Sequence, residues 1–236
     1  MKSIATAALV LLGFVSSQQI TRPIHELTKK PVHEKNEISQ ANWPTVKFYK
    51  DYIASGDLMK YNSQTKTLES LHGSSVFAQV DNTNDRMIQD FSGDMSGLGL
   101  GEMVIYIDAK QHALYQKFVQ ANQCHKMDLP EGFSLSETYK HAFDPAYNIT
   151  SYNGVESLEW ENNANQYHAF HVNMGVGQSE TYYFDVKSTE LIWTVRDDKQ
   201  LIIHTPKGVQ QKTFKDSDFV LPVCKGTSEE YMAFLE

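Results

Sequence analysis

The sequence predicts a mainly β protein built on one large, curved antiparallel sheet, a half-barrel with one or two short helices in its concave face. Residues 180–196 alternate apolar and polar side chains with a period of two, which is typical of strands. Turn signals separate about ten or eleven such runs, and the 11% aromatic content suits sheets more than helical bundles. A sheet of this size tends to curl, so its concave side needs a filling.

The first 17 residues have the form of a secretory signal peptide. Lys2 precedes an apolar run from Ala5 to Val15, and small serines follow it. The run is shorter than the roughly 20 residues that a membrane anchor needs. We therefore expect a protein that is secreted, either extracellular or in the lumen of the secretory pathway. Residues 18–44 are polar and predict a loosely held N-terminal arm.

The predicted β domain covers residues 45–226, and its first half reads as strands and hairpins. A strand begins at Val46, and residues 76–91 form a hairpin around a polar turn. A glycine-rich loop at 93–101 leads into strands at 103–108 and 113–119.

The second half of the domain begins with the main irregular insertion. Ser134 and Glu137 form a capping box that predicts a short helix over 134–143. The remaining elements are six predicted strands, at 155–161, 167–174, 182–186, 191–196, 201–205 and 209–214, the last four forming a meander. Residues 227–236 are expected to be a short C-terminal tail.

The chain has two cysteines, Cys124 and Cys224, which predict one disulfide in an oxidising compartment. The bridge would close a loop of about 100 residues and contribute about 4 to 5 kcal/mol in the chain-entropy model. The alternative is two buried free thiols. Asn148 begins the sequon Asn-Ile-Thr in a predicted loop, so we expect it to be glycosylated.

The formal net charge of −8 is spread along the chain, which argues against a nucleic-acid partner. No strong catalytic motif is present: Gly93 to Gly97 lacks the glycine spacing of a nucleophile elbow. Asp81, Thr83 and Asp85 open like a calcium loop, but the glycine and glutamate that such a loop needs are missing. We therefore expect no catalytic residue, no metal ligand and no cofactor, and hence no enzyme.

The order of elements resembles the LolA-like superfamily of secreted and periplasmic half-barrels, which includes the ependymin-related proteins of animals. The resemblance rests on Cys124 after a strand hairpin, the Pro-containing insertion 129–145, and a closing meander. That meander contains 183–186 and 191–193 and ends in Phe219, Leu221, Pro222 and Cys224. The resemblance implies a curved sheet with helices in its mouth that binds lipids or other apolar ligands without catalysis. This chain has fewer cysteines than the ependymin-related pattern.

A set of large apolar side chains is the predicted ligand-binding site, because a curved sheet could present them in one apolar pocket. The set consists of Trp160, Phe170, Tyr182, Phe184, Leu191 and Trp193. The predicted partner is a hydrophobic small molecule or lipid; transient membrane contact and a homodimer stay open. The alternative function is an extracellular structural or adhesion protein whose sheet is filled by its own side chains.

Overall fold

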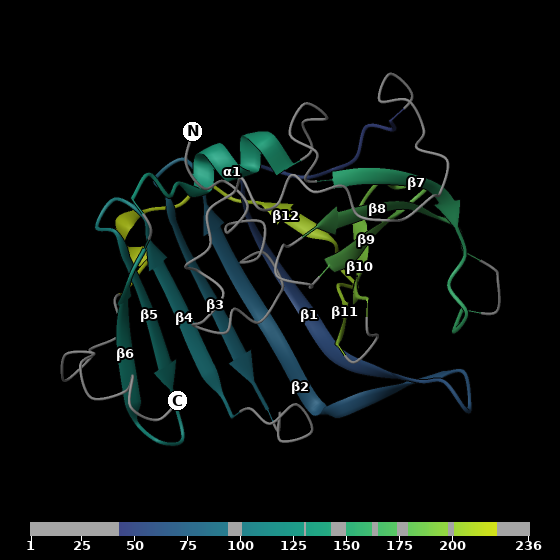
Figure 1. Cartoon of the computed structure of the whole chain (residues 1–236), viewed down its shortest axis with the longest axis horizontal. Coiled ribbons are helices and arrows are strands. Elements are labelled where there is room, and N and C mark those ends of the chain that lie inside the picture. Colours follow the sequence, from purple (N-terminus) through teal and green to yellow (C-terminus); the bar gives the residue numbers. More distant parts are fainter. Residues whose placement is uncertain are drawn as a thin grey trace.

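The computed structural model describes residues 43–93, 101–129, 131–142, 150–161, 165–173, 179–197 and 201–220. In these ranges twelve strands form one antiparallel sheet, which confirms the predicted fold class. The order is β6-β5-β4-β3-β2-β1-β11-β10-β9-β8-β7, with β12 paired to β1. β6 and β7 are the two edges, so the sheet is open (Figure 1).

The sheet consists of two meanders that meet at β1. The first contains β1 (Asp51–Asn62), β2 (Thr67–Asp81), β3 (Arg86–Ser92), β4 (Met103–Asp108), β5 (Ala113–Phe118) and β6 (Gln123–Asp128). The second contains β7 (Thr150–Glu156), β8 (Tyr167–Asn173), β9 (Ser179–Asp185), β10 (Leu191–Arg196) and β11 (Ile202–His204). The last strand is β12 (Val209–Gln211).

Strand β1 joins the two meanders, because it pairs with β2 on one side and with both β11 and β12 on the other. Gly56 allows this close approach: a Cβ atom there would lie 2.5 Å from Cγ2 of Ile203 and 3.1 Å from the His204 carbonyl oxygen. A glycine inside a strand commonly marks such a contact. The pairing of β1 with β2 also shifts register between Asp57 and Met59.

The expected four-strand meander is wrong in its last strand. β12 pairs with residues 52–54 of β1, whereas β11 pairs with residues 57–59 of the same strand. The two strands therefore follow one another along β1, and the turn at 206–208 does not reverse the chain. The proline and glycine at 206–208 predict a break between two strands, but they do not predict which strand β12 pairs with.

Three further sequence predictions differ from the structure. Residues 46–50 lie outside the strands, apart from one isolated bridge between Lys47 and Glu190. The strand predicted at 155–161 is β7, five residues earlier, and β6 was not predicted as a strand. Its six residues at the sheet edge are mostly polar, and none of them is fully buried, so they show no apolar alternation.

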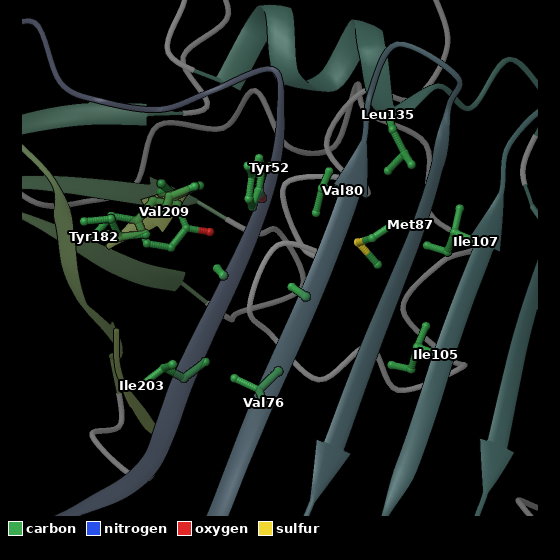
Figure 2. Close-up of a cluster of buried hydrophobic side chains, with 14 of the residues drawn as sticks. Tyr52, Val76, Val80, Met87, Ile105, Ile107, Leu135, Tyr182, Ile203 and Val209 are labelled. Atoms are coloured by element: carbon green, nitrogen blue, oxygen red, sulfur yellow. The ribbon is translucent and has the colours of Figure 1, made fainter. Parts of the chain in front are cut away.

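The strands bury apolar side chains on both faces of the sheet. On the inner face, the inner cluster contains Tyr52, Ala54, Leu58, Val76, Ala78, Val80, Met87, Phe91, Met103, Ile105, Ile107, Phe170, Val172, Tyr182, Phe184, Leu191, Ile203 and Val209, among others. On the opposite face, the outer cluster contains Tyr61, Leu158, Tyr167, Trp193, Val195 and Ile202. Figure 2 shows inner-cluster side chains that project from neighbouring strands toward one interior.

Helix α1 (Leu135–Ala142) lies across one end of β2, β3 and β4 (Figure 1). Its predicted cap is confirmed: the Ser134 hydroxyl accepts a hydrogen bond from the Glu137 amide at 3.2 Å. Asp85, in the turn between β2 and β3, accepts hydrogen bonds from the Ser134 hydroxyl and the Ser136 amide. The helix start is thus bound to the sheet, and Leu135 enters the inner cluster near Val80 and Met87 (Figure 2).

Other predictions fall on residues outside the described ranges. These are the signal peptide and most of the arm (residues 1–42), Asn148, Cys224 and the tail, so processing, glycosylation and the Cys124–Cys224 disulfide stay predictions. Within the part of the chain that the structure describes, no helix is both long and apolar enough to cross a membrane.

Arg86 links the segment after β12 to the outer face of the sheet through a hydrogen bond and a cation–π contact. Its Nε donates to Asp81 and its Nη1 donates to Asp216, both at 2.8 Å, and its guanidinium lies 4.3 Å from the centroid of the Phe219 ring. Phe219 in turn packs edge-on against Tyr106. The Asp81 side chain is only 2% exposed; its carboxylate also accepts hydrogen bonds from the Asn84 main-chain and side-chain amides, and Arg86 supplies the positive charge beside it.

We expect Arg86→Met to lower the free energy of unfolding by about 3 kcal/mol, because it leaves a buried carboxylate without its cation. Urea denaturation followed by circular dichroism would measure this. Lys47→Met is the control, since the Lys47–Glu190 ion pair is exposed and its loss should cost less than about 1 kcal/mol. Equal losses in the two variants would contradict the proposed role of Arg86.

Candidate ligand-binding face

The structure divides the six predicted ligand-binding residues between the two faces. Phe170, Tyr182, Phe184 and Leu191 belong to the inner cluster, with their side chains at most 2% exposed. Trp193 belongs to the outer cluster, and Trp160 packs against that cluster. The structure therefore brings four of the six together and places the two tryptophans elsewhere.

A bulge in β10 explains why Leu191 and Trp193 lie on opposite faces. Residues two apart in a regular strand share a face. Here the pairing with β9 shifts register between Leu191, which faces Phe184, and Trp193, which faces Tyr183. The extra residue changes which side chains point inward, and a sequence pattern with apolar residues at both positions does not reveal it.

The two tryptophans contact each other and neighbouring side chains on the outer face. The Trp193 indole stacks on His204, with ring centroids 4.1 Å apart, and it meets Trp160 edge-on at 5.7 Å. Its Nε1 donates to Glu161 at 3.2 Å. These contacts satisfy the Trp193 side chain as part of a second core.

A small cavity lies at the centre of the inner face, where the two meanders meet. It has a volume of about 10 Å³, room for about one water molecule. Its lining consists of Phe48, Tyr52, Ala54, Tyr182, Leu191, Thr205 and Val209. Tyr182 and Val209 lie side by side with Tyr52 nearby (Figure 2), so three separate strands contribute to this point.

Two tyrosine hydroxyls at this cavity are buried without a hydrogen-bond partner among the described residues. Tyr52 and Tyr182 are each 2% exposed, and neither hydroxyl makes a hydrogen bond of ordinary geometry there, although the Tyr182 hydroxyl and the Glu180 carboxyl lie close enough to interact with each other. Burial raises the pKa of both phenols, so both stay protonated and can donate. A buried polar group that lacks a partner is costly and rare in native proteins.

Glu180 lies two residues before Tyr182 on the same face of β9, and it is 3% exposed. Burial raises the pKa of its carboxyl to about 7, and the nearby positive charge of Arg196 and the interaction with the Tyr182 hydroxyl oppose this shift. Its Oε2 atom has no hydrogen-bond partner within the described segments. A carboxyl with such a pKa is a functional-site candidate when it lies near a cavity.

Gln89 is fully buried on the inner face of β3, and both atoms of its amide lack a partner in the described part of the chain. It stands between Met87 and Phe91, which both belong to the inner cluster. Thr194 on β10 is also buried, and its hydroxyl is likewise without a partner among the residues described.

These polar residues are not among the predicted site residues, although a signal was present in the sequence. Gln89 lies at a core position of an alternating run, between Met87 and Phe91, and Glu180 lies two residues before Tyr182. A polar residue at an apolar position of a strand pattern indicates a buried polar group. That signal could have identified both positions.

A threonine, a histidine and an aspartate meet on the outer face. Nδ1 of His171 lies 3.4 Å from the Thr181 hydroxyl and 3.7 Å from Oδ1 of Asp197. A catalytic triad uses the two opposite nitrogens of the imidazole, one for each partner. Here one nitrogen faces both groups, so the arrangement does not match a triad. In the described ranges no three His, Cys, Asp or Glu side chains are grouped to hold a metal ion.

Comparisons with known proteins leave the family open. No family model matches the chain, and no curated protein matches it. Among solved structures, an uncharacterized conserved protein from Thermus thermophilus is similar with a TM-score of 0.43 and 7% identity, over 76% of this chain and 90% of that one. A similarity of this size carries no argument about function.

The raised pKa of Glu180 predicts a stability that falls as pH rises. Between the ordinary carboxyl value of 4.5 and about 7, the folded protein holds a proton that the unfolded chain has lost. Wild type should therefore lose stability over this window, relative to Glu180→Gln, by about 3 kcal/mol.

Urea denaturation from pH 4 to pH 8 would check this difference. Glu180→Gln should be the more stable protein at pH 8 and nearly equal to wild type at pH 4. Glu69→Gln, at an exposed carboxyl, is the control. Parallel pH curves for wild type and Glu180→Gln would show that the carboxyl is not buried as described.

Proposed function

We propose that this protein is a secreted, non-catalytic protein that binds a hydrophobic ligand, a lipid or fatty-acid-like molecule, in the concave inner face of its sheet. It would act outside the cell or in the lumen of the secretory pathway. The observation that carries the proposal is the inner face itself: one continuous apolar cluster that also holds buried polar groups without partners in the described ranges. Apolar ligand sites are built in this way, from an apolar lining with a few polar anchors.

The cover over this face supports the same proposal. Outside the strands and the residues next to them, the described side chains that join the inner cluster come from two stretches, 43–49 and 129–135. Phe48 stacks on Tyr139 of α1, with ring centroids 5.6 Å apart, and the Tyr139 hydroxyl donates to the Phe48 carbonyl at 2.7 Å. Phe48 also lines the cavity. A ligand would enter by displacing such side chains rather than strands.

The alternative, an extracellular structural or adhesion protein with a self-filled core, is favoured by one observation. Met87, Phe91 and Phe184 on the inner face are each 0% exposed. Side chains so fully covered can serve as ordinary core. The two functions therefore differ in whether the inner face accepts a ligand, and a binding measurement separates them.

We expect native mass spectrometry of the secreted protein, followed by organic extraction, to find a stoichiometric apolar adduct. The neutral fluorophore N-phenyl-1-naphthylamine should bind the emptied protein with micromolar affinity, and Phe184→Leu should weaken this binding about tenfold, because it reshapes the inner face.

Trp193→Leu is the matched control, since Trp193 is also buried but belongs to the outer cluster. Both variants should lose about 1 to 3 kcal/mol of stability, but only Phe184→Leu should lose affinity. A wild-type protein that carries no adduct and takes up no fluorophore would contradict ligand binding and support the self-filled core.

A further inference from the structure

The buried polar atoms without partners are concentrated on one face of the sheet. Eight such side-chain atoms occur in the described ranges, and all but Nε1 of Trp160 belong to residues of the inner face or packed against it. Glu180 and Thr194 share that face with Tyr182: Glu180 is two residues away on β9, and Thr194 is its cross-strand neighbour on β10. In an ordinary core such atoms are few and scattered. Their gathering on one face indicates a place where polar groups of another molecule are bound.

Gln89 lies in a row of small side chains that leads to the cavity. It pairs with Ala78 on β2, and Ala78 pairs with Ala54 on β1. Ala54 lines the cavity together with Tyr52 and Tyr182. Neighbouring strands are about 4.8 Å apart, so Gln89 and Ala54 are separated by about 10 Å along the sheet. No bulky side chain of this row stands between the amide and the cavity.

The chemistry of these groups favours an uncharged partner. The Gln89 amide and the hydroxyls of Tyr52, Tyr182 and Thr194 are neutral and can both donate and accept hydrogen bonds. The remaining polar group, the Glu180 carboxyl, can only add negative charge. A carboxylate or phosphate buried here would be repelled by the ionised Glu180 carboxyl, and it would compete with Glu180 for the positive charge of its cross-strand neighbour Arg196. A hydroxyl, amide or ester group would be satisfied by the groups present.

We infer that the inner face selects a neutral amphiphile, a molecule with an apolar body and an uncharged hydroxyl, amide or ester headgroup, over an ionised fatty acid. Gln89, Tyr52 and Tyr182 hydrogen-bond the headgroup, and the inner cluster contacts the apolar body. The inference rests on the proposed function, since it names the class of ligand for the same face.

Two ligands with the same hydrocarbon chain test this selectivity. Monoolein and oleate differ in the headgroup, which is a neutral glycerol ester in one and a carboxylate in the other. Each is titrated below its critical micelle concentration, at pH 8, against protein loaded with N-phenyl-1-naphthylamine. Monoolein should displace the fluorophore at a concentration at least tenfold lower than oleate does.

Gln89→Leu and Tyr182→Phe should each weaken monoolein binding about tenfold, the equivalent of one buried hydrogen bond, and leave oleate binding unchanged. Gln89→Leu should unfold at the same or a higher urea concentration than wild type, because it removes a buried polar group that lacks a partner in the described ranges. Tyr182→Phe should unfold at a similar or slightly lower one, because it also loses the interaction with Glu180. Gln79→Leu is the control: Gln79 lies on the other face of β2, where its Oε1 accepts a hydrogen bond from Lys212 at 3.5 Å.

Three results would overturn the inference. Oleate could bind as tightly as monoolein, or Gln89→Leu and Tyr182→Phe could bind monoolein like wild type; either result would reject headgroup selection and leave ligand binding intact. A wild-type protein that binds neither the fluorophore nor either lipid would reject the proposed function as well.

Discussion

The pairing of β1 with strands from both ends of the chain is the constraint on which the structure depends. Its twelve residues lie between β2 on one side and β11 and β12 on the other, so the two meanders are joined through this one strand. Gly56 makes the contact with β11 close enough, because any larger side chain would collide with Ile203. The cavity and the buried tyrosines lie along this junction. The cavity of the candidate ligand-binding face thus exists only where the two halves of the chain meet.

The polar groups on the inner face have an energetic cost for the folded protein. Each buried atom without a partner costs of the order of 1 to 3 kcal/mol, against a total stability of about 5 to 15 kcal/mol for a typical domain. Such a cost is common where a site is prepared for something other than folding. The free energy of unfolding is therefore lower with Gln89, Tyr182 and Glu180 than it would be with apolar residues of similar size at these positions.

The sequence predicted β10 at its observed bounds, but it could assign the faces of a strand only where the two faces differ. The hairpin of β2 and β3 alternates cleanly, and its prediction is confirmed. In β10 both faces are buried, since Leu191 packs inward and Trp193 outward. A run that is apolar throughout has no period that assigns a face, and the bulge was hidden within it. The capping box of α1 was predictable because it depends only on neighbouring residues.

The two cores of the sheet also separate the three tryptophans of the chain. Trp160 and Trp193 contact each other on the outer face, whereas Trp43 packs edge-on against Phe170 on the inner face, with ring centroids 5.6 Å apart. Intrinsic fluorescence of this protein is therefore a sum of two signals with different origins. Emission from Trp43 should report on the inner face, and emission from Trp160 and Trp193 on the outer face.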